Sequence, residues 1–218
     1  MKKIFCSVML LFAVTTMFAQ TTGSKVNDTQ STAILDALQK KITSYSSAII
    51  QFKLREEKND KMLSELSGTL YLKGNKYMLN TKDQQIFCNA KDVWTYLPAQ
   101  NEVSITTFDS TDSDNLNPLQ LVKDYKKMYR STFIREESQR GVLVQIVDLT
   151  PLKASSIGRV RLIIDKNKKQ LLKTEILEKD GTTYNYIIEK LTVNQTIDDS
   201  KFIFKTSQYP NVDVIDMR

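Results

Sequence analysis

The sequence contains no histidine and only two cysteines among its 218 residues. The absence of histidine excludes Ser-His-Asp and Cys-His catalytic arrangements, and it excludes zinc sites with histidine ligands. Cys6 lies in an N-terminal apolar run, so Cys88 is the single cysteine expected in the mature protein and cannot form an intrachain disulfide. We expect Cys88 to be a buried apolar thiol rather than a reactive one.

Motifs of other enzyme classes are missing as well. The chain has no glycine-rich phosphate loop, no paired-cysteine motif and no nucleophile elbow. Its acidic residues are scattered, and we interpret the pairs Glu56-Glu57 and Asp198-Asp199 as solvated charges in or beside turns. The sequence therefore predicts a protein without a catalytic centre, a metal site or a cofactor.

Long apolar runs are missing after the N-terminus. Lys2 and Lys3 precede an apolar run over residues 4–18, which is too short for a stable membrane span and is typical of a secretory signal peptide. We expect cleavage after Ala19, which places the mature protein in the periplasm. Cys6 lacks the small preceding residues that lipidation requires, so we expect no lipid anchor.

The mature chain is predicted to be a flexible polar leader over residues 20–27 followed by a single domain over residues 28–218. Loss of Lys2 and Lys3 with the signal peptide lowers the formal net charge from +6 to +4, because residues 1–19 hold no acid. This mild excess favours solubility, and export argues against a nucleic-acid partner. We expect a monomer.

The first predicted element is a helix. It is capped by Asp28 or Ser31 and runs to about residue 44. Four apolar residues recur in it at helical spacing and form one stripe: Ile34, Leu35, Leu38 and Ile42. This helix either packs on a sheet core or covers a space for a ligand.

Short runs of alternating apolar and polar residues follow, joined by polar turns such as Gly74-Asn75 and a charged turn over residues 56–60. They predict one antiparallel sheet of roughly ten or eleven strands, curled into an incomplete barrel and covered by two or three helices. We expect strands at residues 47–55, 66–73, 76–80, 86–89, 93–97, 102–108, 142–146, 160–164, 171–178, 182–193, around Phe202 and Phe204, and at 212–215.

A polar breaker over residues 109–118 interrupts the strands. Pro118 then opens a predicted helix over residues 119–129, with four apolar residues on one side: Leu121, Val122, Tyr125 and Met128. Such a helix is either a movable lid or a fixed packing element.

Several motifs, taken together in their order, carry a resemblance to a known family. They are Gly68-x-Leu70-Tyr71-Leu72-Lys73, Trp94-x-Tyr96-x-Pro98, Asn117-Pro118-Leu119-x-Leu121 and Asp198-x-x-x-Phe202-x-Phe204. Over nearly the whole mature sequence the chain resembles the periplasmic lipoprotein carrier of the LolA family.

The resemblance implies an unclosed β-barrel with helices as a lid over an apolar cavity. Such a carrier is not an enzyme. It accepts a triacylated lipoprotein from an inner-membrane ATP-driven exporter and hands it to an outer-membrane acceptor. One departure concerns the lid: proteobacterial members carry Arg-Pro after the lysine matching Lys73, and that arginine tethers the lid. Here Gly74-Asn75 follows instead, so we expect the lid to be held mainly by apolar contacts.

Alternation and family placement together give the expected site. The residues predicted to line the lipid-binding cavity are Ile34, Leu35, Leu38, Phe52, Leu70, Leu72, Tyr77, Leu79, Val160, Leu162 and Ile164. The predicted lid residues are Leu119, Leu121, Val122 and Tyr125. The sequence leaves open which face of the strand with Trp94 and Tyr96 points inward.

Other functions remain compatible with the sequence. A carrier or sensor of another periplasmic lipid or glycolipid would have the same half-barrel. A hydrolase with an apolar cavity is a weaker alternative, because no plausible catalytic triad exists.

Overall fold

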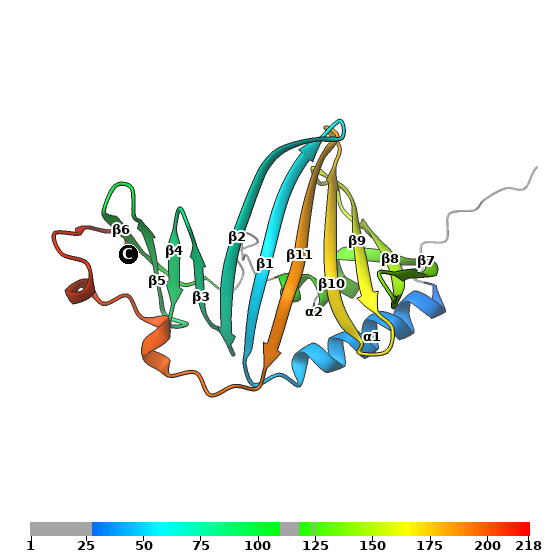
Figure 1. Ribbon diagram of the computed structural model, residues 1–218, viewed down its shortest axis with the longest axis horizontal. Coiled ribbons are helices and arrows are strands. Elements are labelled where there is room, and N and C mark those ends of the chain that lie inside the picture. Colours follow the sequence, from blue (N-terminus) through cyan, green and yellow to red (C-terminus); the bar gives the residue numbers. More distant parts are fainter. Residues whose placement is uncertain (1–27, 110–117, 124) are drawn as a thin grey trace, which may run out of the picture.

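The computed structural model describes residues 28–109, 118–123 and 125–218. The strands of this part form one curved sheet in the order β12-β6-β5-β4-β3-β2-β1-β11-β10-β9-β8-β7 (Figure 1). The sheet does not close, since β12 and β7 are its two edges. This confirms the predicted mainly β architecture with few helices. The strands are β1 Ala48–Lys58, β2 Lys61–Lys73, β3 Lys76–Thr81, β4 Gln85–Cys88, β5 Asp92–Leu97, β6 Glu102–Thr107, β7 Tyr129–Gln139, β8 Val142–Pro151, β9 Ile157–Asp165, β10 Gln170–Glu178, β11 Thr182–Val193 and β12 Asp213–Asp216.

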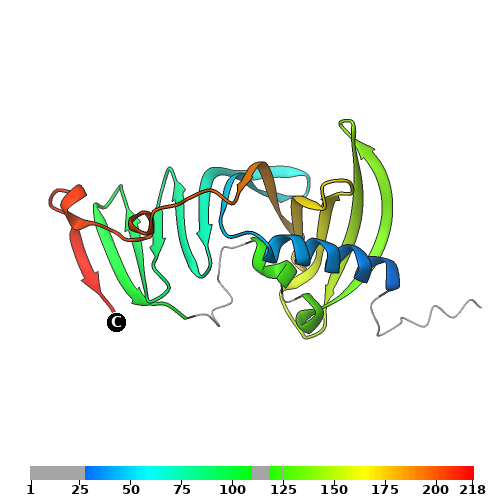
Figure 2. The same ribbon diagram turned by 90° about the horizontal axis from the view of Figure 1, so that it is seen from below.

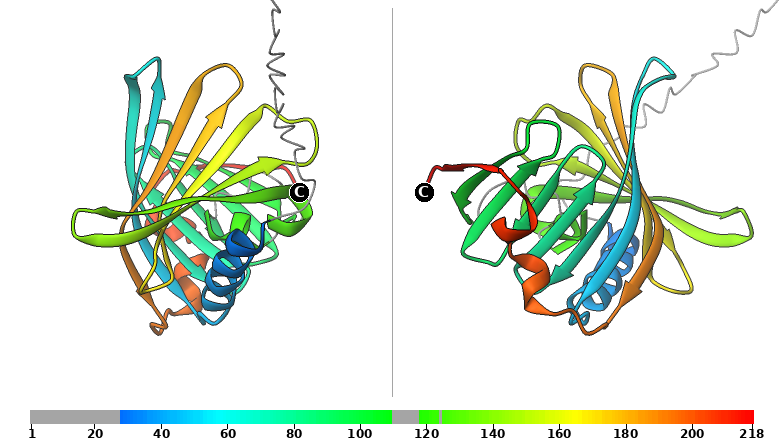
Figure 3. Two further views of the ribbon diagram at one scale, coloured as in Figure 1. Left: turned by 90° about the vertical axis from the view of Figure 1, so that its right-hand side faces the viewer. Right: turned by 60° about the vertical axis from the view of Figure 1, so that its left-hand side comes forward.

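Helix α1 (Thr29–Thr43) covers one face of the sheet, which we call the inner face (Figures 1 and 3). Asp28 caps the helix, because its carboxylate accepts a hydrogen bond from the Ser31 backbone N–H at 2.7 Å. The helix lies across one end of the long strands, so the opposite ends of β1, β2, β10 and β11 extend beyond it (Figure 1). Two short helices, α2 (Pro118–Lys123) and α3 (Tyr125–Met128), lie beside α1.

Side chains alternate between the two faces of the sheet, where they form an inner cluster, an outer cluster and a smaller cluster of Val144, Ile146 and Ile163 on β8 and β9. The inner cluster joins α1, α2 and α3 to the sheet, and its buried members are Leu35, Leu38, Ile42, Ala48, Ile50, Phe52, Leu70, Leu72, Leu79, Val122, Tyr125, Tyr129, Val147, Leu149, Val160, Leu162, Ile164, Leu171 and Ile188. The outer cluster lies on the other face, and its buried members are Met78, Phe87, Tyr96, Val103, Ile197, Phe202 and Phe204.

The segment that follows β11 covers the outer face of β3–β6 (Figure 2). Phe202 and Phe204 do not form the predicted strand. Phe202 ends a short 3-10 helix, η1 (Asp199–Phe202), whose start is capped by Asp198, and a second such turn is η2 (Thr206–Gln208). Phe202 and Phe204 are two residues apart, which is the spacing typical of a strand. In the structure the chain is not a strand here, and both rings are buried against the sheet.

Strand β12 pairs with β6 in parallel, so the prediction of a wholly antiparallel sheet was wrong at this edge. The reason is the path of the chain, which returns along the outer face and arrives beside β6. Asn101 fixes this return, because its side-chain amide donates hydrogen bonds to the backbone oxygens of Pro210 at 3.1 Å and Asn211 at 3.0 Å.

Two other predicted elements differ in extent, and one strand was not predicted. Residues 56–58, expected in a turn, continue β1 and pair with both β2 and β11. The predicted helix over residues 119–129 is instead α2 and α3, and Tyr129 already begins β7. Strand β7 itself was missed, whereas the strand expected around Phe202 and Phe204 is not part of the described twelve-stranded sheet. At residues 56–58 and from Tyr129 onward, pairing with a neighbouring strand overrides a weak local pattern.

Gly68 allows the close packing of β2 against β3. A Cβ at this position would lie 2.8 Å from the Asn80 carbonyl oxygen and 2.8 Å from Phe52 Cζ. The Gly68→Ala variant is therefore expected to lower the free energy of unfolding by about 1–3 kcal/mol, because backbone must shift to relieve the overlap. Gly158→Ala is the matched control, since its nearest contact is the Leu177 carbonyl oxygen at 3.4 Å. Equal urea midpoints for the two variants would contradict the expectation.

Candidate functional site

The inner cluster gathers the residues that the sequence predicted for a cavity. Nine of them are buried in it: Leu35, Leu38, Phe52, Leu70, Leu72, Leu79, Val160, Leu162 and Ile164. Ile34 and Tyr77 are partly buried at its margin. The structure thus brings all of these side chains together on one apolar face, and their role in lipid binding stays a prediction.

The lid helices, as we call α2 and α3, pack against the same cluster. Val122 and Tyr125 are fully buried in it, and Leu121 is half-buried at its margin. The side chain of Leu119 lies outside the described residues. Apolar contact with the inner cluster is therefore part of what holds the lid helices.

Polar contacts between α1 and the lid helices were missed by the sequence analysis. Asp36 on α1 accepts hydrogen bonds from Tyr125 Oη at 2.8 Å and from Lys126 Nζ at 2.9 Å. Gln39 Nε2 donates to the Lys123 carbonyl oxygen at 2.6 Å. The Lys126 ammonium lowers the pKa of Asp36, and the Tyr125 hydroxyl contributes. The one sequence feature that could have indicated these contacts is Asp36 itself, an acidic residue beside the apolar stripe of α1.

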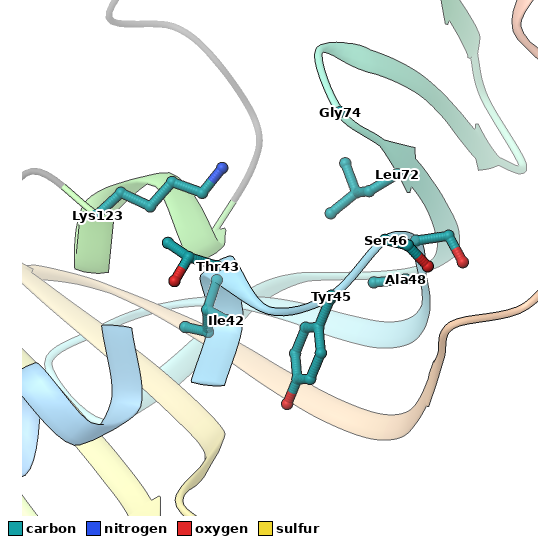
Figure 4. Close-up of a pocket in the computed structure, with 9 residues that line it drawn as sticks. Ile42, Thr43, Tyr45, Ser46, Ala48, Leu72, Gly74 and Lys123 are labelled. Carbon is teal, nitrogen blue, oxygen red and sulfur yellow. The ribbon is translucent and has the colours of Figure 1, made fainter. Parts of the chain in front are cut away.

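Two small pockets lie at the inner face. One of about 210 Å³ lies between the end of α1, β1, β2 and α2, with Leu72 and Lys123 on opposite sides (Figure 4). Another of about 160 Å³ is lined by residues that include Ile34, Ile164 and Lys169. Both are smaller than the roughly 300–1,000 Å³ typical of ligand pockets. Where α1, α2 and α3 cover the sheet, their side chains pack directly against the inner face.

The outer face has a separate set of contacts. Trp94 and Tyr96 point to the outer cluster, which settles the question that the sequence left open. Lys73, which precedes the position of the missing arginine, donates to the Ile197 carbonyl oxygen at 2.9 Å and pairs with Asp199 at 2.8 Å. Hydrogen bonds from Lys73 and Lys76 lower the pKa of Asp199 to about 2. This corner of the sheet fastens the C-terminal segment and not the lid helices.

Reactive or metal-binding side chains are few among the described residues. Cys88 is buried, as predicted, and desolvation raises the pKa of its thiol. No group of three or more potential metal ligands occurs in residues 28–109, 118–123 and 125–218. In the same part of the chain no helix is long and apolar enough to span a membrane.

The Asp36 contacts predict a measurable effect on the lid helices. In Asp36→Ala, amide exchange over residues 118–128 is expected to be about fivefold faster, since one hydrogen-bond acceptor worth about 1 kcal/mol is removed. Because the folded-state pKa of Asp36 is lowered, its contribution is complete above about pH 4 and is lost as the pH falls through the folded value. Wild type and variant should therefore converge at acidic pH.

Hydrogen exchange followed by mass spectrometry, corrected for intrinsic rates, measures this effect. Lys40→Ala, an exposed change on the same helix, is the control and should leave the lid unchanged. Identical exchange in Asp36→Ala and Lys40→Ala at pH 7 would show that Asp36 does not hold the lid helices.

Known proteins match this arrangement. The family model for the outer membrane lipoprotein carrier protein LolA matches residues 40–205 of the chain. An outer-membrane lipoprotein carrier protein from Shewanella sp. (strain W3-18-1) is 26% identical over 225 residues, which cover 100% of this chain and 98% of that protein.

Two crystal structures show a similar fold at low sequence identity. An uncharacterized conserved protein from Thermus thermophilus matches with a TM-score of 0.57 at 11% identity, covering 86% of this chain and 99% of that one. LprF from Mycobacterium bovis matches with a TM-score of 0.50 at 10% identity, covering 79% and 98%. The family match begins at residue 40, in the last turn of α1, and ends after η1, so it includes strands β1 to β11 and the lid helices. The chain therefore belongs to the LolA family of outer-membrane lipoprotein carrier proteins, which bind cargo and are not enzymes.

Proposed function

We propose that this lipoprotein carrier holds the acyl chains of its cargo on the inner face of the sheet and moves them through the periplasm from the inner to the outer membrane. The observation that carries the proposal is the inner cluster. It is one continuous apolar surface shared by the sheet, α1 and the lid helices. A surface of this kind can exchange contacts with its own helices for contacts with an acyl chain.

Because of this exchange, the empty carrier and the cargo-loaded carrier lie close in free energy. Fully burying a side chain such as Val122 contributes about 1.5–3 kcal/mol to the closed arrangement. Each buried CH₂ of an acyl chain contributes about 0.8 kcal/mol in return. Cargo that displaces the lid helices thus gains only the difference between the two terms. This difference leaves the carrier able to give up cargo that a preformed apolar cavity would retain.

The lid helices, rather than α1, are the elements proposed to move. Among the side chains that the structure describes, α2 and α3 fully bury Val122 and Tyr125, whereas α1 buries Ser31, Leu35, Leu38 and Ile42. Helix α1 is also tied to β7, because Ser31 Oγ lies 2.7 Å from Ser131 Oγ and Asp28 accepts from the Phe133 backbone N–H. Displacing α1 therefore costs more.

Partners and location complete the proposal. Acylated lipoproteins are the cargo, an inner-membrane ATP-driven exporter loads the carrier, and an outer-membrane acceptor receives the cargo. Carriers of this family work in the periplasm. For this chain, export by the signal peptide over residues 1–19, a leader over 20–27, a single domain over 28–218 and a monomeric state are part of the proposal.

Native mass spectrometry of the exported protein tests this function. We expect a monomer that begins at Gln20 and a fraction of the protein that carries a triacylated peptide or lipoprotein. Recovery of a glycolipid or another lipid, with no acylated peptide under any condition, would support the alternative carrier or sensor role and overturn lipoprotein transport.

A further inference from the structure

Two hydroxyl groups lie within the apolar inner face. Thr174 on β10 and Tyr186 on β11 are directly opposite each other in the sheet. Tyr186 stacks on Phe52, with ring centroids 4.8 Å apart, and packs against the inner cluster. Thr174 is opposite Leu162 on its other side. We call Thr174 and Tyr186 the hydroxyl pair.

Neither hydroxyl has a hydrogen-bond partner in the part of the chain that the structure describes. Thr174 is only 4% exposed, and both Thr174 Oγ1 and Tyr186 Oη are buried. Burial raises the pKa of Tyr186, so its hydroxyl stays protonated and remains a donor at neutral pH. The large majority of buried side-chain polar atoms in proteins are satisfied, so two orphaned donors side by side require an explanation.

We propose that the hydroxyl pair binds an acyl carbonyl of the cargo, which is an ester or amide oxygen at the head of an acyl chain. This inference rests on the proposed function and names the polar anchor within the apolar site. A carbonyl oxygen has two lone pairs and no donor, so it can accept one hydrogen bond from each hydroxyl. An alkyl chain offers no acceptor. The hydroxyl pair therefore selects acylated over alkylated lipid and fixes the depth at which the chain lies.

The position of the hydroxyl pair fits this role. Leu162 is opposite Thr174, and Leu54 is opposite Tyr186 on β1, so apolar side chains flank both hydroxyls. An acyl chain whose carbonyl is held here has apolar surface on both sides along the sheet. Since neither hydroxyl is paired within the described residues, binding satisfies both without breaking a hydrogen bond there.

The test uses variants that remove one oxygen each and keep the side-chain volume: Thr174→Val, Tyr186→Phe and the double variant. Tyr184→Phe is the matched control, because Tyr184 lies two residues away on β11, opposite Ile176, and its hydroxyl is not among the orphaned ones. The first probe is a synthetic peptide whose N-terminal cysteine carries a dipalmitoyl glyceryl group through ester bonds. The second probe is its dialkyl ether counterpart, and the third is that ether peptide with an N-palmitoyl amide.

Wild type is expected to bind the ester probe more tightly than the ether probe. Each single variant should weaken ester binding about 2–10-fold, as for the loss of one hydrogen bond, and the double variant should no longer distinguish ester from ether. Loss confined to the third probe would identify the amide as the bound carbonyl and support the proposal equally. Tyr184→Phe should bind all probes as wild type does.

Two results would overturn the inference. Wild-type affinity of the double variant for all three probes would show that the hydroxyl pair does not contact cargo. A fall of several degrees in Tm for the double variant would show that the hydroxyls have partners within the folded protein. Failure of wild type to bind any of the probes would be a different result, because it would refute acyl binding on the inner face and the hydroxyl pair with it.

Discussion

Leu121→Glu is expected to abolish lipoprotein retention while the sheet stays folded. Leu121 is half-buried and joins α2 to the margin of the inner cluster. Burying a carboxylate there without a partner costs several kcal/mol, more than the few that hold the lid helices closed. The lid helices would then be displaced even without cargo, and their charged side could not pack on a bound acyl chain. Retained cargo should therefore fall at least about tenfold, which corresponds to about 1.4 kcal/mol.

A transfer assay from inner-membrane vesicles measures this loss, with circular dichroism to confirm that the sheet is intact. Met128→Glu is the matched control, since it adds the same charge to α3 at a side chain that is 52% exposed. It should retain cargo as wild type does. Full uptake and retention by folded Leu121→Glu would show that α2 is a fixed packing element and that cargo enters elsewhere.

Phe202→Ala is expected to lower the free energy of unfolding by about 3–5 kcal/mol. Phe202 is fully buried in the outer cluster, and its loss leaves a cavity between the C-terminal segment and the sheet. The neighbouring variant Ile203→Ala is the control, because Ile203 is 39% exposed and should change the stability by less than about 0.5 kcal/mol.

Urea unfolding provides the measurement for this pair. Trp94 is the only tryptophan and packs against the outer cluster, so its fluorescence reports on this region directly. Agreement between fluorescence and circular dichroism would support two-state unfolding and a single free energy. Equal losses in Phe202→Ala and Ile203→Ala would show that the C-terminal segment does not stabilise the sheet through its buried ring.

The elements that sequence patterns predicted best are those with one wholly apolar side. The α1 stripe and the alternation of Val160, Leu162 and Ile164 each bury a continuous row of side chains, so their period is visible in the sequence. Strand β7 was missed for the opposite reason. It is an edge strand whose second half, including Ile134 and Arg135, is largely exposed. Side chains that stay in solvent need not alternate between apolar and polar, so the strand leaves no pattern in the sequence.

Contacts between distant segments were harder to predict from the sequence. Asp36 looks like any solvated acid on a helix until α3 brings Tyr125 and Lys126 to it. Thr174 and Tyr186 are ordinary strand residues until the register places them opposite each other inside the inner face. No local pattern encodes a meeting of this kind, because it depends on the path of the whole chain.

The parallel pairing of β12 with β6 has a consequence for the order of folding. Residues 102–105 pair with residues 213–216. This pairing spans more than half of the chain and is among the least local contacts in the fold. Until the C-terminal segment arrives, Met78, Phe87 and Val103 have no cover on the outer face. A chain in which β3 to β6 pair before the C-terminal segment docks would expose this apolar face to other chains. Variants that delay the docking, such as Phe202→Ala, are therefore expected to aggregate more during refolding than Ile203→Ala.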